Sequence, residues 1–385
     1  MNAWNLGARR RVGRVPRILM AALVAGALIG LPVSAFAAGA SCVVRAQGTP
    51  VTYTSVQAAL DASPTGATLL VRGTCVGTTV VARNATIRAA PVRASYRATL
   101  DGALGGSVIT VNAGVTLKLE RLVITRGFFS FSDPHPGGGG ILNRGTLTLT
   151  RSVVKESTGH QGGGIANLGT ATILHSAIDH NGNYEGGNIW NSGTLVVKDS
   201  KITRGVGRFG QGIWNASGGS ATLIRSSVTD SDRGLLFSGG GIENHGDLTL
   251  RHSDVSRNAS IWGGGILNEG IAHIESSTVS NNVGDNGGGG ILNGPAFFPG
   301  SGAEKIFLVN SKISGNTANF GGGVYNKGVV TADGPSRIGG NTAGGMGQGG
   351  GIFNDTGASV VGVTTDTFSP PNIPDQCVGC APGGG

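Results

Sequence analysis

The sequence of 385 residues has few charged and few aromatic residues, which make up 13% and 5% of the chain. So little charge excludes a highly charged disordered chain, and 39% of hydrophobic residues is enough to build a core. Glycine follows no three-residue period, which excludes collagen. Beyond residue 37 no stripe of Lys and Arg is interleaved with aromatic residues, so we expect no nucleic-acid partner.

Long apolar runs are also scarce, and the only one lies near the N-terminus. It covers residues 18–31, follows the arginine-rich residues 9–17 and precedes the small-residue pattern Ala35-Phe36-Ala37. These three parts predict a secretory signal peptide over residues 1–37. The alternative is an uncleaved anchor helix, which the short run disfavours. We therefore expect a secreted protein, extracellular or associated with the cell surface, with no transmembrane segment after signal removal.

Cysteine is rare, with four residues in two widely separated pairs: Cys42 and Cys75, then Cys377 and Cys380. An even number in an exported chain indicates disulfides, and four cysteines allow three connectivities. Pairing by proximity joins Cys42 to Cys75 and Cys377 to Cys380. The C-terminal C-x-x-C could instead be a redox or metal pair, but no second ligand pair accompanies it, which favours the structural role.

What the sequence has in abundance is glycine, with 71 residues, many of them in a repeat. From residue 137 the phrase Gly-Gly-Gly-Ile-x-Asn-x-Gly recurs, followed by a β-type run and Ser-x-Val/Ile-x-x-Asn. The anchor asparagines are most often 24 residues apart, which indicates a solenoid with one supersecondary unit per repeat. They are Asn143, Asn167, Asn191, Asn215, Asn244, Asn268, Asn293, Asn326 and Asn354.

The repeat unit is of β type. Residues 145–150 alternate so that Leu147 and Leu149 face one side, and three short strands with their turns fit 24 residues. This predicts an all-β fold, a single-stranded right-handed parallel β-helix. The anchor asparagines should form a structural ladder, each tolerating a left-handed backbone and bonding its neighbour in the next coil. Two inward columns are expected, one from Ile141 to Ile352 and the other from Val154 to Ile338.

The chain outside the repeats divides into three parts. Residues 1–37 are the predicted signal peptide, and residues 38–136 are predicted to form an N-terminal cap and the first coils. The cap should contain a helix near residues 55–62, because Val56, Ala59 and Leu60 share one face. Repeat coils then occupy residues 137–361. Residues 362–385, which contain Pro370, Pro371 and Pro374, are predicted to form a C-terminal tail.

Several of these segments carry a resemblance. Residues 138–149 (GGGILNRGTLTL) and 277–282 (STVSNN) resemble repeats of exported bacterial parallel β-helix proteins of the pectin-lyase-like superfamily. They are also similar to repeats of polymorphic outer-membrane proteins. Residues 54–61, 71–75 and 100–102 look like the capping region of secreted members. The resemblance implies the fold far more than the function, because this superfold hosts lyases, hydrolases and adhesins.

A catalyst of this class would need two carboxylates, or a metal and a base, on adjacent coils. Aligning the repeats places Asp179, His180, Arg204 and Asp230 near one another as weak catalytic candidates. They could form an acid/base group, but charge compensation at a coil corner is favoured because no column stacks two acids on consecutive coils. For the same reason we expect no metal site, and no cofactor is indicated.

A second surface signal lies one residue before the anchor asparagine. Trp190 and Trp214 occupy this position in neighbouring coils and could form one aromatic platform, because indole stacks on the apolar face of a sugar ring. The alternative is that these aromatic residues simply cover the sheet. Flanking loops contribute further candidate substrate-binding residues, namely Tyr184, Glu185, Arg208 and Arg233.

Together these features predict a monomeric, non-catalytic extracellular protein that binds a polysaccharide or cell-envelope surface or has a structural role. One alternative is a polysaccharide lyase or glycoside hydrolase acting on acidic polysaccharide. The other alternative is a protein adhesin.

Overall fold

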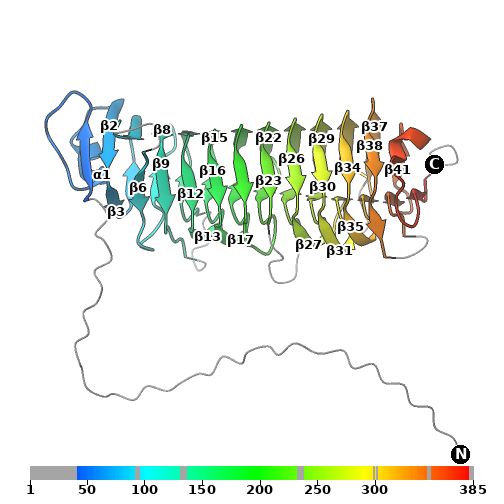
Figure 1. The fold of residues 1–385 in the computed structure, drawn as a ribbon. Helices are drawn as coiled ribbons and strands as arrows, with labels where there is room; N and C mark the ends of the chain where they lie inside the picture. The colour runs from blue at the N-terminus through cyan, green and yellow to red at the C-terminus, as the bar shows by residue number, and fades with distance from the viewer. Residues whose placement is uncertain are drawn as a thin grey trace, which may run out of the picture. The chain divides into compact units, whose positions relative to one another are not determined.

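The computed structural model describes residues 41–91, 96–130, 137–231, 238–297, 300, 302–344 and 348–380. These residues form a parallel β-helix, as the repeat predicts. Its coils stack along one axis from the blue N-terminal end to the red C-terminal end (Figure 1). The predicted signal peptide and Arg233 lie outside the described residues.

Each complete coil contributes one strand to each of three long sheets. Sheet 1 contains the anchor asparagines and has twelve strands: β4 (Thr79–Val81), β7 (Ile109–Val111), β10 (Ile141–Asn143), β14 (Ile165–Asn167), β18 (Ile189–Asn191), β21 (Ile213–Asn215), β24 (Ile242–Asn244), β28 (Ile266–Asn268), β32 (Ile291–Asn293), β36 (Val324–Asn326), β40 (Ile352–Asn354) and β42 (Cys377–Val378).

Sheet 2 follows sheet 1 in each coil. It has thirteen strands: β1 (Val43–Ala46), β2 (Ala67–Arg72), β5 (Ala85–Ala89), β8 (Thr116–Glu120), β11 (Thr146–Thr150), β15 (Thr170–Leu174), β19 (Thr194–Lys198), β22 (Ser220–Ile224), β25 (Asp247–Arg251), β29 (Ile271–Glu275), β33 (Lys305–Val309), β37 (Val329–Asp333) and β41 (Ser359–Val361). Only the pairing of β1 with β2 is antiparallel among the strand pairs of the described chain.

Sheet 3 comes next and has eleven strands: β3 (Thr74–Val76), β6 (Ala98–Asp101), β9 (Leu122–Thr125), β12 (Val153–Lys155), β16 (Ala177–Asp179), β20 (Lys201–Thr203), β23 (Ser227–Thr229), β26 (Asp254–Ser256), β30 (Thr278–Ser280), β34 (Lys312–Ser314) and β38 (Arg337–Gly339). Short strands on the way back to sheet 1 form two further groups, which we call sheet 4: β13 (Thr158–Gln161) with β17 (Gly182–Glu185), and β27 (Ala259–Trp262), β31 (Val283–Gly287), β35 (Thr317–Phe320) and β39 (Thr342–Ala343).

The core is the inside of this stack. Both predicted inward columns are confirmed, because every member from Ile141 to Ile352 and from Val154 to Ile338 is fully buried. Strand pairing keeps the columns in register, so that Ile165 lies between Ile141 and Ile189. A fully buried Ile or Val contributes roughly 1.5–3 kcal/mol, and repetition of this contact stabilises the coil stack.

The anchor asparagines form the predicted side-chain ladder. Each Nδ2 donates to the Oδ1 of the asparagine in the next coil at 2.7–2.8 Å, from Asn143 to Asn354. The expected left-handed backbone was wrong. The left-handed residues at the coil corners are others, such as His180, Arg204 and Asp230, because the anchor asparagines end the strands of sheet 1.

A second asparagine ladder follows sheet 3. Asn258, Asn282, Asn316, Asn341 and Asn372 are buried and linked side chain to side chain at 2.9–3.1 Å. Its last member lies in the segment expected to be a tail. In that segment Val363 and Phe368 also join the core, so residues 362–380 close the last coil.

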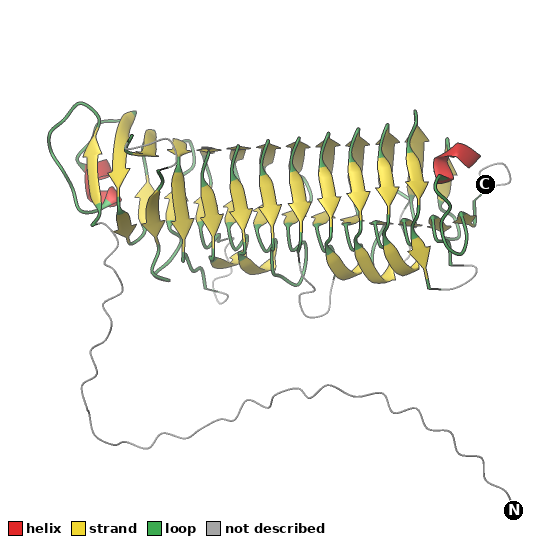
Figure 2. Ribbon diagram, in the orientation of Figure 1, coloured by secondary structure: helices red, strands yellow, loops and turns green. Residues whose placement is uncertain are grey.

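Helices occur only at the two ends of the described coil stack (Figure 2). Helix α1 (Val56–Asp61) is the predicted cap helix, and the Ser55 side chain accepts a hydrogen bond from the Ala58 N–H at its first turn. The 3₁₀ helix η1 (Thr365–Phe368) lies near the other end. Both disulfides predicted by proximity are present, Cys42–Cys75 and Cys377–Cys380.

Candidate binding face

The predicted catalytic group lies at the corner that follows sheet 3. Arg204 pairs with Asp179 through both carboxylate oxygens, with Nε 2.9 Å from Oδ1, and the Thr203 hydroxyl donates to the same oxygen at 2.6 Å. Asp230 is paired instead with Arg257 of the next coil, at 2.7 and 2.9 Å. The structure thus brings Asp179 and Arg204 together, but each carboxylate has its own arginine.

These arginines keep both carboxylates ionised. Burial opposes ionisation of Asp179, but the hydrogen bonds from Arg204 and Thr203 prevail and lower its pKa. The Arg257 guanidinium lowers the pKa of Asp230. A general acid needs a raised pKa, so this corner has the electrostatics of charge compensation.

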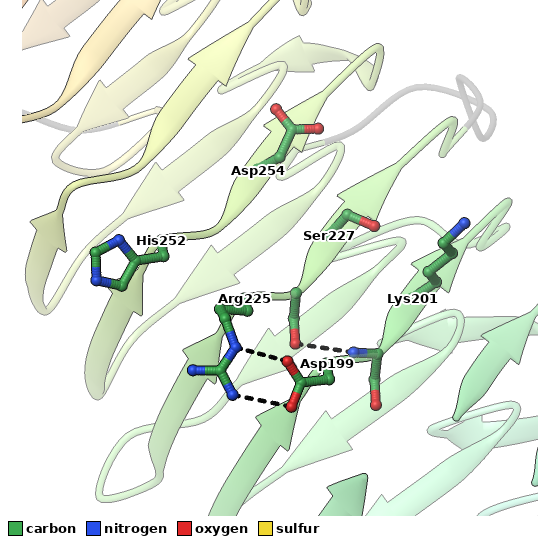
Figure 3. Close-up of a pocket in the computed structure, with 8 residues that line it drawn as sticks. Asp199, Lys201, Arg225, Ser227, His252 and Asp254 are labelled. Atoms are coloured by element: carbon green, nitrogen blue, oxygen red, sulfur yellow. Dashed lines mark hydrogen bonds and ion pairs between the residues drawn. The ribbon is translucent and has the colours of Figure 1, made fainter. Parts of the chain in front are cut away.

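An open depression at the corner between sheets 2 and 3 repeats the same design (Figure 3). Arg225 pairs with Asp199 at 2.7 and 3.0 Å, which lowers the pKa of that carboxyl. Lys201, His252 and Asp254 surround the pair. Both acids and bases line the depression, and the Asp199 carboxylate is already paired with Arg225.

The expected platform of two exposed indoles is not present. Trp190 and Trp214 are direct partners on strands β18 and β21, but Trp190 is only 7% exposed. It packs in a cluster with Leu142 and Ala166. The chain turns sharply from sheet 4 into sheet 1 at glycines such as Gly186, where φ is +67° and a Cβ would lie 2.4 Å from the Ile189 carbonyl oxygen. This turn lays the backbone next to Trp190, since the same Cβ would lie 2.9 Å from the Trp190 Cα. The Trp190 cluster is completed by Trp214, Leu168 and Ala216, which belong to sheet 1 or directly follow its strands.

Trp214 is half-buried and belongs to an aromatic cluster that we call aromatic site 1. Its ring lies 5.7 Å from Phe209, which lies 5.7 Å from Tyr184, and both contacts are edge to face. The Arg208 guanidinium lies 4.7 Å from the Tyr184 ring centre and donates to the Tyr184 hydroxyl at 3.0 Å. The His245 imidazole lies 4.6 Å from Trp214 and completes the site.

A buried acid lies beside aromatic site 1. Glu243 occupies the outward column of sheet 1 one coil after Trp214 and is only 3% exposed. Its carboxylate accepts hydrogen bonds from the Gly210 N–H at 3.1 Å, the Ser238 hydroxyl at 3.2 Å and His245 Nε2 at 3.2 Å. Glu243 therefore ties the irregular coils around residues 210 and 238 to sheet 1.

His245 bridges two carboxylates. Its Nε2 faces Glu243, and its Nδ1 lies 3.2 Å from Glu269 of the next coil. Burial opposes protonation of His245, but the hydrogen bonds to Glu243 and Glu269 prevail and raise its pKa to about 9. Burial also raises the pKa of Glu243. The His245 ring of aromatic site 1 is therefore a protonated imidazolium at neutral pH.

The other residues predicted to bind substrate do not all lie in one site. Tyr184 and Arg208 belong to aromatic site 1, and Glu185 accepts a hydrogen bond from Gln161 on the neighbouring strand at 3.0 Å. Sequence reasoning missed the role of Glu243, although it is the one acid in a column of otherwise apolar or aromatic residues.

The described residues hold no group of three or more His, Cys, Asp or Glu side chains arranged to bind a metal ion. His245 lies between Glu243 and Glu269 and engages them with different ring nitrogens, so these three do not converge on a common point. Within the same residues no helix has the length and hydropathy to cross a membrane.

A scan against protein-family models found no match to this chain. Searches of curated proteins and of solved structures found no match either.

Proposed function

We propose that this chain is an exported, non-catalytic β-helix protein that binds a polysaccharide, in the cell envelope or outside the cell, through aromatic site 1. The observation that carries the proposal is the contiguous run of half-buried rings from Tyr184 through Phe209 to Trp214, flanked by Arg208 and His245. Aromatic faces stack on the apolar side of sugar rings, and a few fixed polar groups orient the hydroxyls.

Export is supported by the signal-like N-terminal sequence and by the two disulfides, since disulfides persist in oxidising compartments. The repeats resemble those of exported pectin-lyase-like β-helix proteins, which is consistent with an extracellular role. The hydrolase or lyase alternative depends on the corner of Asp179 and Asp230. Arginine pairing lowers both pKa values there, which favours binding over acid catalysis.

The test is retention on immobilised polysaccharides, followed by titration of soluble fragments. Trp214→Ala should weaken binding roughly tenfold, because it removes the largest ring of the site. The matched control is Phe307→Ala, which removes a comparable stacked ring beside His273 on sheet 2. Equal binding by wild type and Trp214→Ala would refute the proposal. Release of new reducing ends or unsaturated sugars would refute its non-catalytic part.

A further inference from the structure

A second aromatic cluster, aromatic site 2, lies farther along the same face. It contains Trp262 of β27, Phe320 of β35, Tyr325 of β36, Phe353 of β40 and Phe297. The ring centres are 5.2 Å apart for Tyr325 and Phe353, 6.4 Å for Trp262 and Tyr325, and 6.3 Å for Trp262 and Phe297. These residues therefore form one continuous surface.

Aromatic site 2 is open to solvent. Phe297 is 62% and Phe320 is 37% exposed, and the only other exposed aromatic residue in the described part of the chain is Phe128. Phe128 pairs with Thr158 of sheet 4, so it belongs to the same side of the coil stack. Exposed aromatic area is thus gathered along the edge where sheets 4 and 1 meet, which is typical of a binding surface.

Polar groups accompany these rings. The Lys327 Nζ lies 5.2 Å from the Tyr325 ring centre and donates to the Pro295 carbonyl at 2.7 Å. The Tyr325 hydroxyl donates to Asp355 at 3.3 Å, and burial together with Asp355 raises its pKa to about 12. The site therefore combines flat apolar rings with a hydroxyl that stays protonated.

The strand register gives the spacing of the rings along the coil axis. Trp214 and Tyr325 occupy the same position on β21 and β36, with β24, β28 and β32 between them. Four steps of about 4.8 Å separate them by roughly 19 Å along the axis. The Trp262 ring lies 6.4 Å from the Tyr325 ring, so these two rings together mark the far end of this span.

The coil rise of about 4.8 Å is close to the rise per sugar unit of an extended β-1,4-linked chain, so the straight span between the two sites suits such a chain. We propose that aromatic sites 1 and 2 bind one extended β-1,4-linked glycan chain, laid parallel to the coil axis, with one sugar stacked near Trp214 and another, farther along the chain, stacked near Trp262 and Tyr325. Between the two sites the partly exposed Glu269 carboxylate offers an acceptor to its hydroxyls. This inference rests on the proposed function and adds the linkage, direction and length of the ligand.

The experiment compares soluble β-1,4-linked N-acetylglucosamine oligomers of different length by calorimetry. The octasaccharide should bind the wild-type chain roughly a hundredfold more tightly than the disaccharide, because the second contact becomes intramolecular. Phe297→Ser combined with Trp262→Ala should abolish this gain and leave disaccharide binding at aromatic site 1 unchanged. Phe297→Ser alone, at an exposed position, should reduce the gain without affecting folding.

An α-1,4-linked glucan octasaccharide, whose chain is curved, should show no comparable gain in affinity over its disaccharide. The inference is overturned if binding does not grow with chain length, or if the α-linked and β-linked chains gain equally. If Trp214→Ala weakens binding while the site 2 variants do not alter it, the proposed function survives and this inference fails. If variants of neither site alter binding, both fail.

Discussion

Carboxylates on two parts of the coil stack respond to their surroundings in opposite ways. At the corner after sheet 3, Asp230 has a side chain 43% exposed and pairs with an arginine that lowers its pKa. On sheet 1, the Glu243 side chain is only 4% exposed, and burial raises its pKa although His245 lies beside it. The residue types are alike, so the difference comes from solvent access.

The comparison shows why a charged cluster is a poor guide to the sensitive part of this protein. When an exposed ion pair loses one partner, water solvates the other at a small cost in free energy. A buried carboxylate has no such water and depends on its fixed hydrogen-bond donors. The Gly210 donor of Glu243 comes from the preceding coil, and the Ser238 and His245 donors lie on either side of its own strand. Glu243 should therefore matter for stability, and the Asp230 pair should not.

The largest effect is expected at Glu243. Glu243→Ala should lower the free energy of unfolding by about 3 kcal/mol, because it leaves buried donors and the His245 imidazolium without their acceptor. Chemical denaturation followed by circular dichroism measures this change.

Glu243→Gln is the matched control, since it keeps an acceptor oxygen and removes the charge. It should be less destabilising than Glu243→Ala. A loss of less than roughly 1 kcal/mol in Glu243→Ala, as at exposed pairs, would show that the buried cluster and the exposed corner do not differ.

The fold could be predicted from the sequence because a solenoid repeats its contacts. Residues one period apart become neighbours, so the columns from Ile141 and Val154 and the ladder from Asn143 follow from alignment alone. The left-handed backbone could not be assigned from residue type, because strand pairing extends the anchor asparagines and leaves the turn to residues such as His180.

The candidate site was only partly predictable. Alignment paired Trp190 with Trp214, but the burial of Trp190 depends on how Leu142, Ala166 and Trp214 pack around it, which periodicity alone does not give. The contact between His245 and Glu269, in contrast, could have been predicted by aligning the repeats. His245 and Glu269 each follow an anchor asparagine in successive coils, so the register places them side by side.

The second effect is the pH dependence of stability, which should differ between the buried cluster of Glu243 and His245 and the exposed corner of Asp230. The His245 pKa is raised from an ordinary value near 6.5 to about 9. Its protonation therefore stabilises the folded chain fully below pH 6.5, and this stabilisation is lost as the pH rises through 9. The raised pKa of Glu243 acts in the same direction. At the exposed corner the lowered Asp pKa values stabilise above pH 3.8, and that contribution is lost on further acidification.

Denaturation midpoints measured from pH 6 to pH 10 check this prediction. Wild type should lose up to about 3 kcal/mol over that range through His245, and His245→Gln should show a flatter alkaline slope. Asp230→Asn should keep the wild-type alkaline slope, because it changes only the other cluster. Identical slopes in wild type and His245→Gln would contradict the assignment of the bridge.

The smallest effect is expected at the exposed pair itself. Asp230→Asn and Arg257→Gln should each lower the free energy of unfolding by less than about 1 kcal/mol, because both side chains are roughly half exposed and can turn to water. A double-mutant cycle isolates the pair, and its coupling should be a few tenths of a kcal/mol at moderate salt. A coupling as large as the Glu243→Ala effect would mean that the Asp230 corner is as specifically organised as the buried cluster. It would then reopen the possibility that the corner was selected for chemistry rather than for charge compensation.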